Sequence, residues 1–205
     1  MSSQKASASL RLPQRQRGRR RVAALLEAAD AVFAEKGYDA ATMTEIAARA
    51  GASIGSLYQF FPTKELLADA LIAQYAEALY DRLASLESAA GGWNADELGA
   101  RLFRLLIDFR AEHGAFAALA EGGGTLPSRA SELRTRLRGR ITSILRRNKP
   151  TMPEASAEVM AIVVQQMMKV AVTLNAEPGL STRAAALDAL RALLQLYLRT
   201  QLEAL

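Results

Sequence analysis

Hydrophobic side chains recur at helical spacing along most of the chain, and these stripes predict a series of helices. Apolar residues stand at i, i+3, i+4 and i+7 within residues 19–35, 63–88, 95–112 and 127–147. Between residues 159 and 174 only four side chains are polar, which predicts a helix buried on nearly all sides. The pattern therefore predicts an all-α fold.

Two much shorter helices are predicted in the stretch TMTEIAARAGASIGSLYQFFPTK. Thr42, with a glutamate three residues later, is typical of the capping box that starts a helix, and Gly51 ends that helix in a left-handed conformation. Ser53 caps the second helix, which Pro62 ends because the residue before proline is forced out of helical geometry. Two such helices joined by a short glycine-containing turn form a helix-turn-helix arrangement.

The second short helix has two distinct faces. At about 100° per residue, Leu57 and Phe61 share the inward face, and Gly55, Ser56 and Gln59 cluster on the opposite side. A face with small residues, a hydroxyl and an amide can lie against base edges in a DNA major groove, where the Gln59 amide can recognise an adenine. The alternative is a short connecting helix whose polar residues face water.

Residues 20–64, above all SIGSLYQFFPTK from Ser53 to Lys64, resemble the N-terminal DNA-binding domain of the TetR family of bacterial transcriptional regulators. The resemblance implies a three-helix DNA-binding domain in residues 17–64 and a helical effector-binding and dimerisation domain in residues 65–205. It implies that Lys64 meets a phosphate. Phe60 departs from the family, which often carries histidine or tyrosine there, so any contact by this residue would be apolar. The residues implied to face DNA are Thr42, Thr44, Ser53, Ile54, Gly55, Ser56, Tyr58 and Gln59.

Positive charge is concentrated at the start of the chain. The whole sequence has a net charge of +5, and residues 1–21 hold seven basic residues and no acidic one. This asymmetry indicates a polyanionic partner. We expect residues 1–16 to form a disordered basic arm; a solubilising tail and an organelle transit peptide are the alternatives. The side chains expected to contact DNA phosphates or the adjacent minor groove are Arg17, Arg19, Arg20 and Arg21.

Several classes of site find little support in the composition. The chain has no cysteine, so disulfides and thiol chemistry are excluded. The only histidine, His113, follows the helix 95–112, where it is expected to cap the helix end. No metal-ligand cluster and no set of nucleophile and base is recognisable, so no metal, cofactor or enzymatic activity is expected. No apolar run is judged long enough to cross a bilayer, and a location in the bacterial cytoplasm, at the nucleoid, is expected.

The last helix, from about residue 182, carries leucines on more than one face and therefore needs a second partner. The resemblance implies that this partner is another copy, because the family dimerises through its last two helices as a four-helix bundle. A two-fold dimer would present two recognition helices about 34 Å apart and so require a near-palindromic operator of double-stranded DNA. The candidate interface residues are Val163, Met167, Val170, Leu190, Leu194 and Tyr197.

The leading hypothesis is a repressor relieved by a small hydrophobic effector; a regulator without a ligand, controlled by abundance or by a protein partner, is the alternative. Methionines suit an adaptable apolar pocket. Arginines are spread around the helix 127–147, where we expect a solvated face, and Gly122–Gly124 should form a flexible joint. The candidate pocket residues, each with core packing as the alternative, are Phe103, Ile107, Phe116, Met160, Val164 and Met168.

Overall fold

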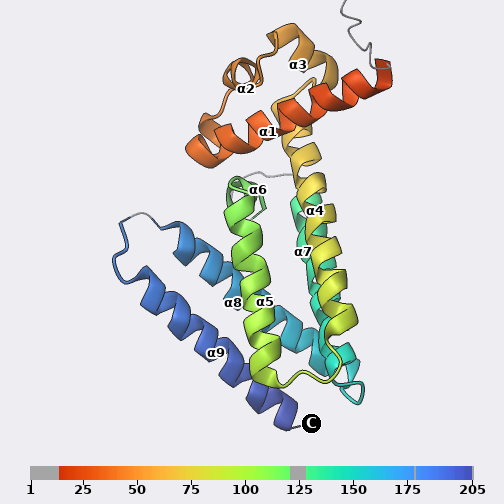
Figure 1. The fold of residues 1–205 in the computed structure, drawn as a ribbon, viewed down its shortest axis with the longest axis vertical. Helices are drawn as coiled ribbons and strands as arrows, with labels where there is room; N and C mark the ends of the chain where they lie inside the picture. The colour runs from red at the N-terminus through yellow and green to blue at the C-terminus, as the bar shows by residue number, and fades with distance from the viewer. Residues whose placement is uncertain (1–13, 121–127, 178, 205) are drawn as a thin grey trace, which may run out of the picture.

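The computed structural model describes residues 14–120, 128–177 and 179–204, and every regular element in those ranges is a helix (Figure 1). Helices α1 to α3 form one end of the molecule, and α4 runs from them into a bundle made by α4 to α9. The all-α fold class, with a helix-turn-helix unit followed by a helical domain, is confirmed. The helices are α1 (Gln14–Ala40), α2 (Met43–Arg49), α3 (Ile54–Phe60), α4 (Lys64–Ala89), α5 (Ala95–Glu112), α6 (Phe116–Ala120), α7 (Ser128–Asn148), α8 (Glu154–Ala176) and α9 (Arg183–Glu203).

Helices α2 and α3 begin at the caps that the sequence predicts. The backbone N–H of Thr42 donates to the Glu45 carboxylate at 3.1 Å, and the N–H of Glu45 donates to the Thr42 hydroxyl at 3.3 Å. The Ser53 hydroxyl accepts from the third N–H of α3 in the same way. Between the two helices Gly51 has a φ of +59°, a value that costs glycine least. These local bonds fix the turn between α2 and α3.

Helix α1 starts earlier than expected, because the glutamines and arginines before residue 19 are themselves good helix formers. Residues 14–16, which the prediction assigned to a disordered arm, are helical, and residues 1–13 lie outside the described residues. The predicted joint at Gly122–Gly124 also lies outside them. At the other end Gly37, with a φ of +75°, breaks the helical backbone just after residue 35, where the hydrophobic stripe ends. The predicted basic arm is therefore, in its last part, the first turn of a helix.

Helix α4 connects the two ends of the molecule. Its N-cap is Thr63, whose hydroxyl accepts from the Leu66 N–H at 3.2 Å. Its buried face, which includes Leu71, Tyr75 and Leu79, packs along α7 on one side and against α1 and α6 at the top (Figure 1). A change in the bundle can therefore reach the helix-turn-helix unit through α4.

Helix α8 is not buried on all sides, as the sequence pattern had suggested. Val159, Ile162 and Val170 are 60%, 40% and 54% exposed, whereas the opposite face of α8 packs on α7 and α9. By length and composition alone Glu154–Asn175 is also apolar enough to cross a membrane, which corrects the expectation that no run is long enough. A core helix of a globular domain passes the same test, and the packed face of α8 assigns it to the bundle.

Candidate DNA-binding surface and effector cavity

The outer face of α3 is open to solvent. Ile54, Gly55, Tyr58 and Gln59 are exposed, Ser56 is half-buried, and no atom lies within 4 Å of the position that a Cβ on Gly55 would take. Helix α3 carries no charged side chain, so a partner meets only hydroxyl, amide, phenol and apolar groups there. Thr42, Thr44 and Ser53, from the starts of α2 and α3, are exposed as well. The inward face is as predicted, with Leu57 and Phe61 buried.

Acidic side chains near this surface are neutralised by bases of the same unit. Glu45 accepts hydrogen bonds from the Lys36 ammonium and from both the hydroxyl and the N–H of Thr42, and these bonds lower the pKa of Glu45 to about 2. Glu35 accepts from the Arg49 guanidinium, a bond that lowers the pKa of its carboxyl. Both carboxylates therefore stay ionised and paired at neutral pH, which weakens their repulsion of a polyanion.

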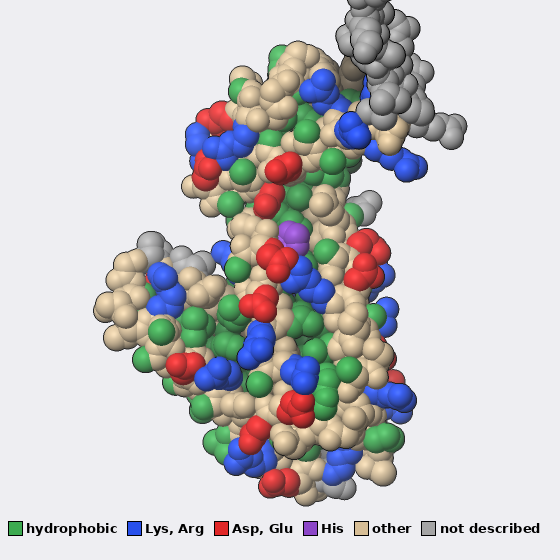
Figure 2. Space-filling view, viewed as in Figure 1, with side chains coloured by type: hydrophobic (Ala, Val, Ile, Leu, Met, Phe, Trp, Pro, Cys, Tyr) green, Lys and Arg blue, Asp and Glu red, His purple; other side chains and the backbone are tan. Residues whose placement is uncertain are grey.

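Arginines extend the surface along the first turns of α1. Figure 2 shows Lys and Arg side chains gathered around the start of α1, close to the end of the molecule that holds α3. A helix presents such side chains in more directions than an extended arm would, so only part of the set can reach one DNA backbone at a time. The exposed arginines are Arg17, Arg19, Arg20 and Arg21.

Lys64 lies differently from what the resemblance implied. Its ammonium donates to the backbone carbonyls of Tyr38, Asp39 and Ala41 at 2.8, 3.1 and 3.1 Å, and it lies 4.6 Å from the centroid of the Tyr38 ring. An ammonium has three N–H donors, and all three are used inside the chain. The geometry therefore does not support the predicted phosphate contact; Lys64 instead ties the start of α4 to the segment between α1 and α2.

A second connection joins the helix-turn-helix unit to the bundle at Asp30 of α1. Its Oδ1 accepts hydrogen bonds from the Tyr75 hydroxyl of α4 and from the Ala115 N–H, at 2.8 Å, just before α6. A Cβ on Gly114 would lie 2.9 Å from the Ala34 Cβ, so α1 and the start of α6 pack closely. His113 caps α5, as predicted: its N–H donates to the Phe109 carbonyl, and its ring packs on the Phe109 ring.

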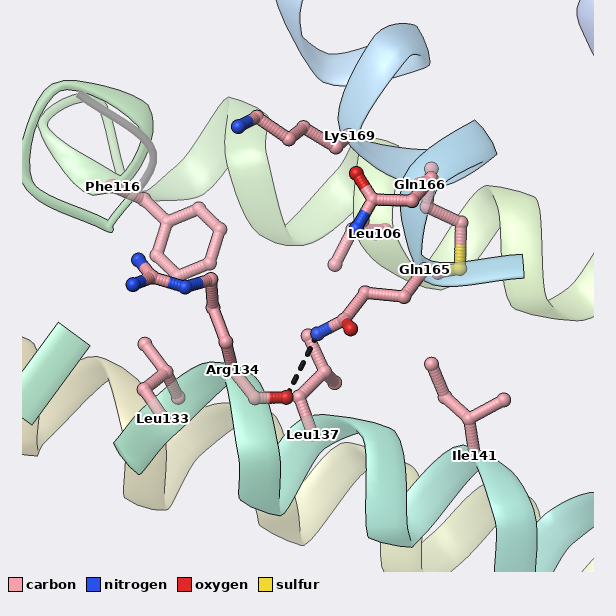
Figure 3. A pocket seen from close by; sticks show the side chains of 10 residues that line it. Leu106, Phe116, Leu133, Arg134, Leu137, Ile141, Gln165, Gln166 and Lys169 are labelled. Carbon is pink, nitrogen blue, oxygen red and sulfur yellow. Dashed lines mark hydrogen bonds between the residues drawn. The ribbon is translucent and has the colours of Figure 1, made fainter. Parts of the chain in front are cut away.

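A cavity of about 70 Å³ lies between α5, α6, α7 and α8 (Figure 3). Of the predicted effector-pocket residues, Phe116 and Met168 line this cavity. Phe103, Met160 and Val164 are buried elsewhere in the core, and Ile107 is half-buried against it, so these four do not line this cavity. Ile107 and Val164 are immediate neighbours of the lining residues Leu106 and Gln165 and so point about 100° away from them, whereas Phe103 and Met160 lie about a turn farther along α5 and α8. The lining residues are Leu106, Phe116, Leu133, Arg134, Leu137, Ile141, Gln165, Gln166, Met168 and Lys169.

Polar residues of the cavity wall were not predicted as a site. Gln165 is only 8% exposed; its amide N–H donates to the Arg134 carbonyl at 2.9 Å, and its amide oxygen accepts from Arg138 at 3.2 Å. Arg136 lies 4.4 Å from the Tyr80 ring centroid. The arginines of α7 are therefore not only a solvated face, because two of them contact buried or aromatic groups. A glutamine pair within an otherwise apolar helix was the available signal.

The outer faces of α8 and α9 form an apolar surface, but one predicted interface residue is not on it. Leu194 is fully buried against the chain's own core, so the prediction is wrong there. Helices α5 and α9 meet closely at Gly99, where a Cβ would lie 3.0 Å from the Gln195 side chain, and this approach turns Leu194 inward. Its neighbours Leu193 and Leu196 are each 55% exposed. Of the other predicted residues, Val170 is exposed, and Val163, Met167, Leu190 and Tyr197 are half-buried.

Comparison with protein families gives two matches, which together cover most of the chain. Residues 25–71 match "Bacterial regulatory proteins, tetR family", and residues 96–198 match "Tetracyclin repressor-like, C-terminal domain". The HTH-type transcriptional repressor KstR2 of Mycobacterium tuberculosis is 45% identical over 58 residues, which are 28% of this chain and 29% of that protein. The HTH-type transcriptional regulator YuxN of Bacillus subtilis is 27% identical over 103 residues, or 50% of this chain and 35% of that protein. The matched regions thus span about a third of these curated relatives.

Solved structures share the fold over nearly the whole chain. A tetR-family transcriptional regulator from Streptomyces coelicolor has a TM-score of 0.66 and 25% identity, over 90% of this chain and 89% of that chain. A TetR-like regulator from Rhodococcus sp. RHA1 has a TM-score of 0.65 and 22% identity, over 95% and 99%. The regulator FadR from Bacillus subtilis, in complex with stearoyl-CoA, has a TM-score of 0.63 and 19% identity, over 84% and 96%.

Proposed function

We infer the function from one premise: the chain belongs to the TetR family of bacterial regulatory proteins, and it is a transcriptional regulator. We propose that it is a repressor that binds a near-palindromic operator as a homodimer, in the bacterial cytoplasm at the nucleoid, and that a small effector releases it. No catalytic activity is part of the proposal.

The open face of α3 carries the DNA-binding part of the proposal. Gly55 leaves room for a close approach, and Gln59 presents an amide beside it, so this face suits contact with base edges. The exposed arginines of α1 supply charge for phosphates. The mycobacterial relative, named as a repressor, matches this chain only over a region of 58 residues.

The operator is the first thing to identify, by selecting bound sites from random DNA duplexes and then footprinting the region upstream of the gene. We expect a near-palindromic site that the protein binds at least about 10³ times more tightly than random duplex. In a plot of the logarithm of the binding constant against the logarithm of the salt concentration, the slope should be about −0.9 for each phosphate contacted. Equal affinity for every duplex would refute sequence-specific binding.

An effector is supported by the cavity between α5 and α8 and by the stearoyl-CoA bound to the FadR neighbour. A ligand releases DNA only if it binds the non-binding conformation more tightly, and couplings of about 1–3 kcal/mol are typical. The small volume of the cavity, about 70 Å³, favours the second candidate, a regulator without a ligand. A gel-shift titration with apolar and amphipathic molecules distinguishes the two candidates, because only a regulator with an effector would be released from the operator by one of these molecules.

A further inference from the structure

We propose that the effector is an amphipathic anion. Its apolar body enters the cavity between α5, α6, α7 and α8, and its carboxylate or phosphate lies between Arg134 and Lys169 (Figure 3). This inference rests on the proposed function as a ligand-responsive regulator, and it names the chemical class of the ligand.

The apolar part of the wall comes from all four helices. Its side chains are almost fully buried, so they can enclose an aliphatic chain and remove it from water, which is favourable. Unbranched methionine and a rotatable phenyl ring adapt to chains of different shape. The residues that form this wall are Leu106, Phe116, Leu133, Leu137, Ile141 and Met168.

Charge in the wall has one sign. Arg134 from α7 and Lys169 from α8 lie on facing helices at the cavity, and none of the lining residues within the described part of the chain is acidic. Gln165 is held inside by its bonds to α7, whereas Gln166 adds a second amide to the wall. Hydrogen bonds from cationic donors to an anion are shorter and stronger than neutral ones, above all beside an apolar region. The wall therefore favours an anionic head group and disfavours a cationic one.

Size explains how such a ligand would act. A small-molecule site usually has about 300–1,000 Å³, so a cavity of about 70 Å³ must widen before an alkyl chain fits. A ligand that fits only the widened state binds it preferentially, as an effector must. Phe116 in the wall directly follows Ala115, whose N–H is bonded to Asp30 of α1. Displacement of Phe116 is thereby passed to the helix-turn-helix unit.

Four probes with the same alkyl chain test the class of ligand by isothermal titration calorimetry on the full chain. They are dodecanoate, dodecyl phosphate, dodecanol and dodecylamine, each below its micellar concentration. We expect at least one anion to bind about tenfold or more tightly than dodecanol, with dodecylamine weaker still. The two anions distinguish a carboxylate from a phosphate head group. Equal or tighter binding of dodecanol would overturn the proposal.

Variants locate the head group. Lys169→Gln and Arg134→Gln replace the charge with a neutral polar side chain, and the second leaves the Arg134 carbonyl in place for Gln165. Each should reduce anion affinity about tenfold without changing dodecanol affinity. Arg147→Gln, on an exposed arginine of the same helix outside the cavity, should change neither. Unchanged anion affinity in both cavity variants would overturn the assignment.

The operator assay keeps this inference separate from the proposed function. Anion binding that leaves operator affinity unchanged would support the site and refute release by an effector. A protein that binds its operator but none of the four probes would overturn the site and leave the DNA-binding function standing.

Discussion

Gln59 is the side chain on the exposed face of α3 best suited to read a base. Gln59→Ala should cost about 1–3 kcal/mol of discrimination at one base pair of each half-site, because a bidentate amide contact to adenine is lost. Affinity for random duplex should not change. Fluorescence anisotropy with the operator and its single-base variants measures both, and Gln74→Ala, on an exposed glutamine of α4, is the matched control. Equal losses on operator and random duplex would remove Gln59 from base recognition.

Lys64 provides a test between two roles for one ammonium. Lys64→Met keeps the length of the side chain but leaves three backbone carbonyls without their donor. We expect a loss of about 1–3 kcal/mol in the free energy of unfolding, measured by urea titration, since unsatisfied polar groups are costly. The salt slope of DNA binding should stay the same. A slope smaller by about 0.9 with unchanged stability would instead restore the phosphate contact.

Two contacts in the helix-turn-helix unit show which side-chain contacts can be predicted from the sequence and which cannot. The Thr42–Glu45 cap was predictable because both partners lie within one turn, so the spacing determines the contact. Lys64 meets carbonyls more than twenty positions earlier, which come together only because the chain turns at Gly37 and folds back. No local pattern predicts the direction of that turn, so the contacts of Lys64 with these carbonyls could not be predicted from the sequence.

At the scale of elements, the hydrogen bond between Tyr75 of α4 and Asp30 of α1 makes the free energy of unfolding depend on pH in the alkaline range. Burial, and then the hydrogen bond to Asp30, raise the pKa of the Tyr75 phenol above its ordinary value of 10.0. The folded state thus holds the proton more tightly than the unfolded state does. This contribution is complete below about pH 10 and is lost as the pH rises further.

Tyr75→Phe removes this dependence along with the hydroxyl. Above about pH 10 the free energy of unfolding should fall more steeply for the unmodified protein than for Tyr75→Phe, by about 1 kcal/mol between pH 10 and pH 11. Urea unfolding followed by circular dichroism at a series of pH values measures both profiles. Parallel profiles would mean that the phenol does not titrate with unfolding.

Helix ends were easier to predict than helix faces. Helices α2 and α3 begin at the caps that the sequence predicts, Thr42 and Ser53, because capping is local. Which side of a helix is buried depends on its neighbours: Leu193 is exposed and Leu194 is not, although one residue is only about 100° of rotation. The same reason applies to the cavity, because Ile107 and Val164 do not line it although their immediate neighbours Leu106 and Gln165 do.

At the scale of the whole molecule, the exposed apolar face of α8 and α9 has no partner within the described part of the chain. Val159, Ile162, Leu193 and Leu196 are between 40% and 60% exposed and lie on two helices that pack against each other. Large apolar side chains exposed on two neighbouring helices are typical of an association site. A second copy fits it best, because a two-fold axis pairs a face with itself and sets the distance between two copies of α3.

Leu193→Glu together with Leu196→Glu tests whether this face holds the dimer together. Two carboxylates on each copy would be desolvated beside apolar groups, so we expect a monomer at micromolar concentration by analytical ultracentrifugation. Leu66→Glu, at a leucine of α4 that is 50% exposed away from this face, should remain a dimer. The monomer should still be folded by circular dichroism, but its affinity for the palindromic operator should be no higher than its affinity for a single half-site. A double variant that stays dimeric and folded would place the interface elsewhere, and the spacing of the two α3 helices would then need another origin.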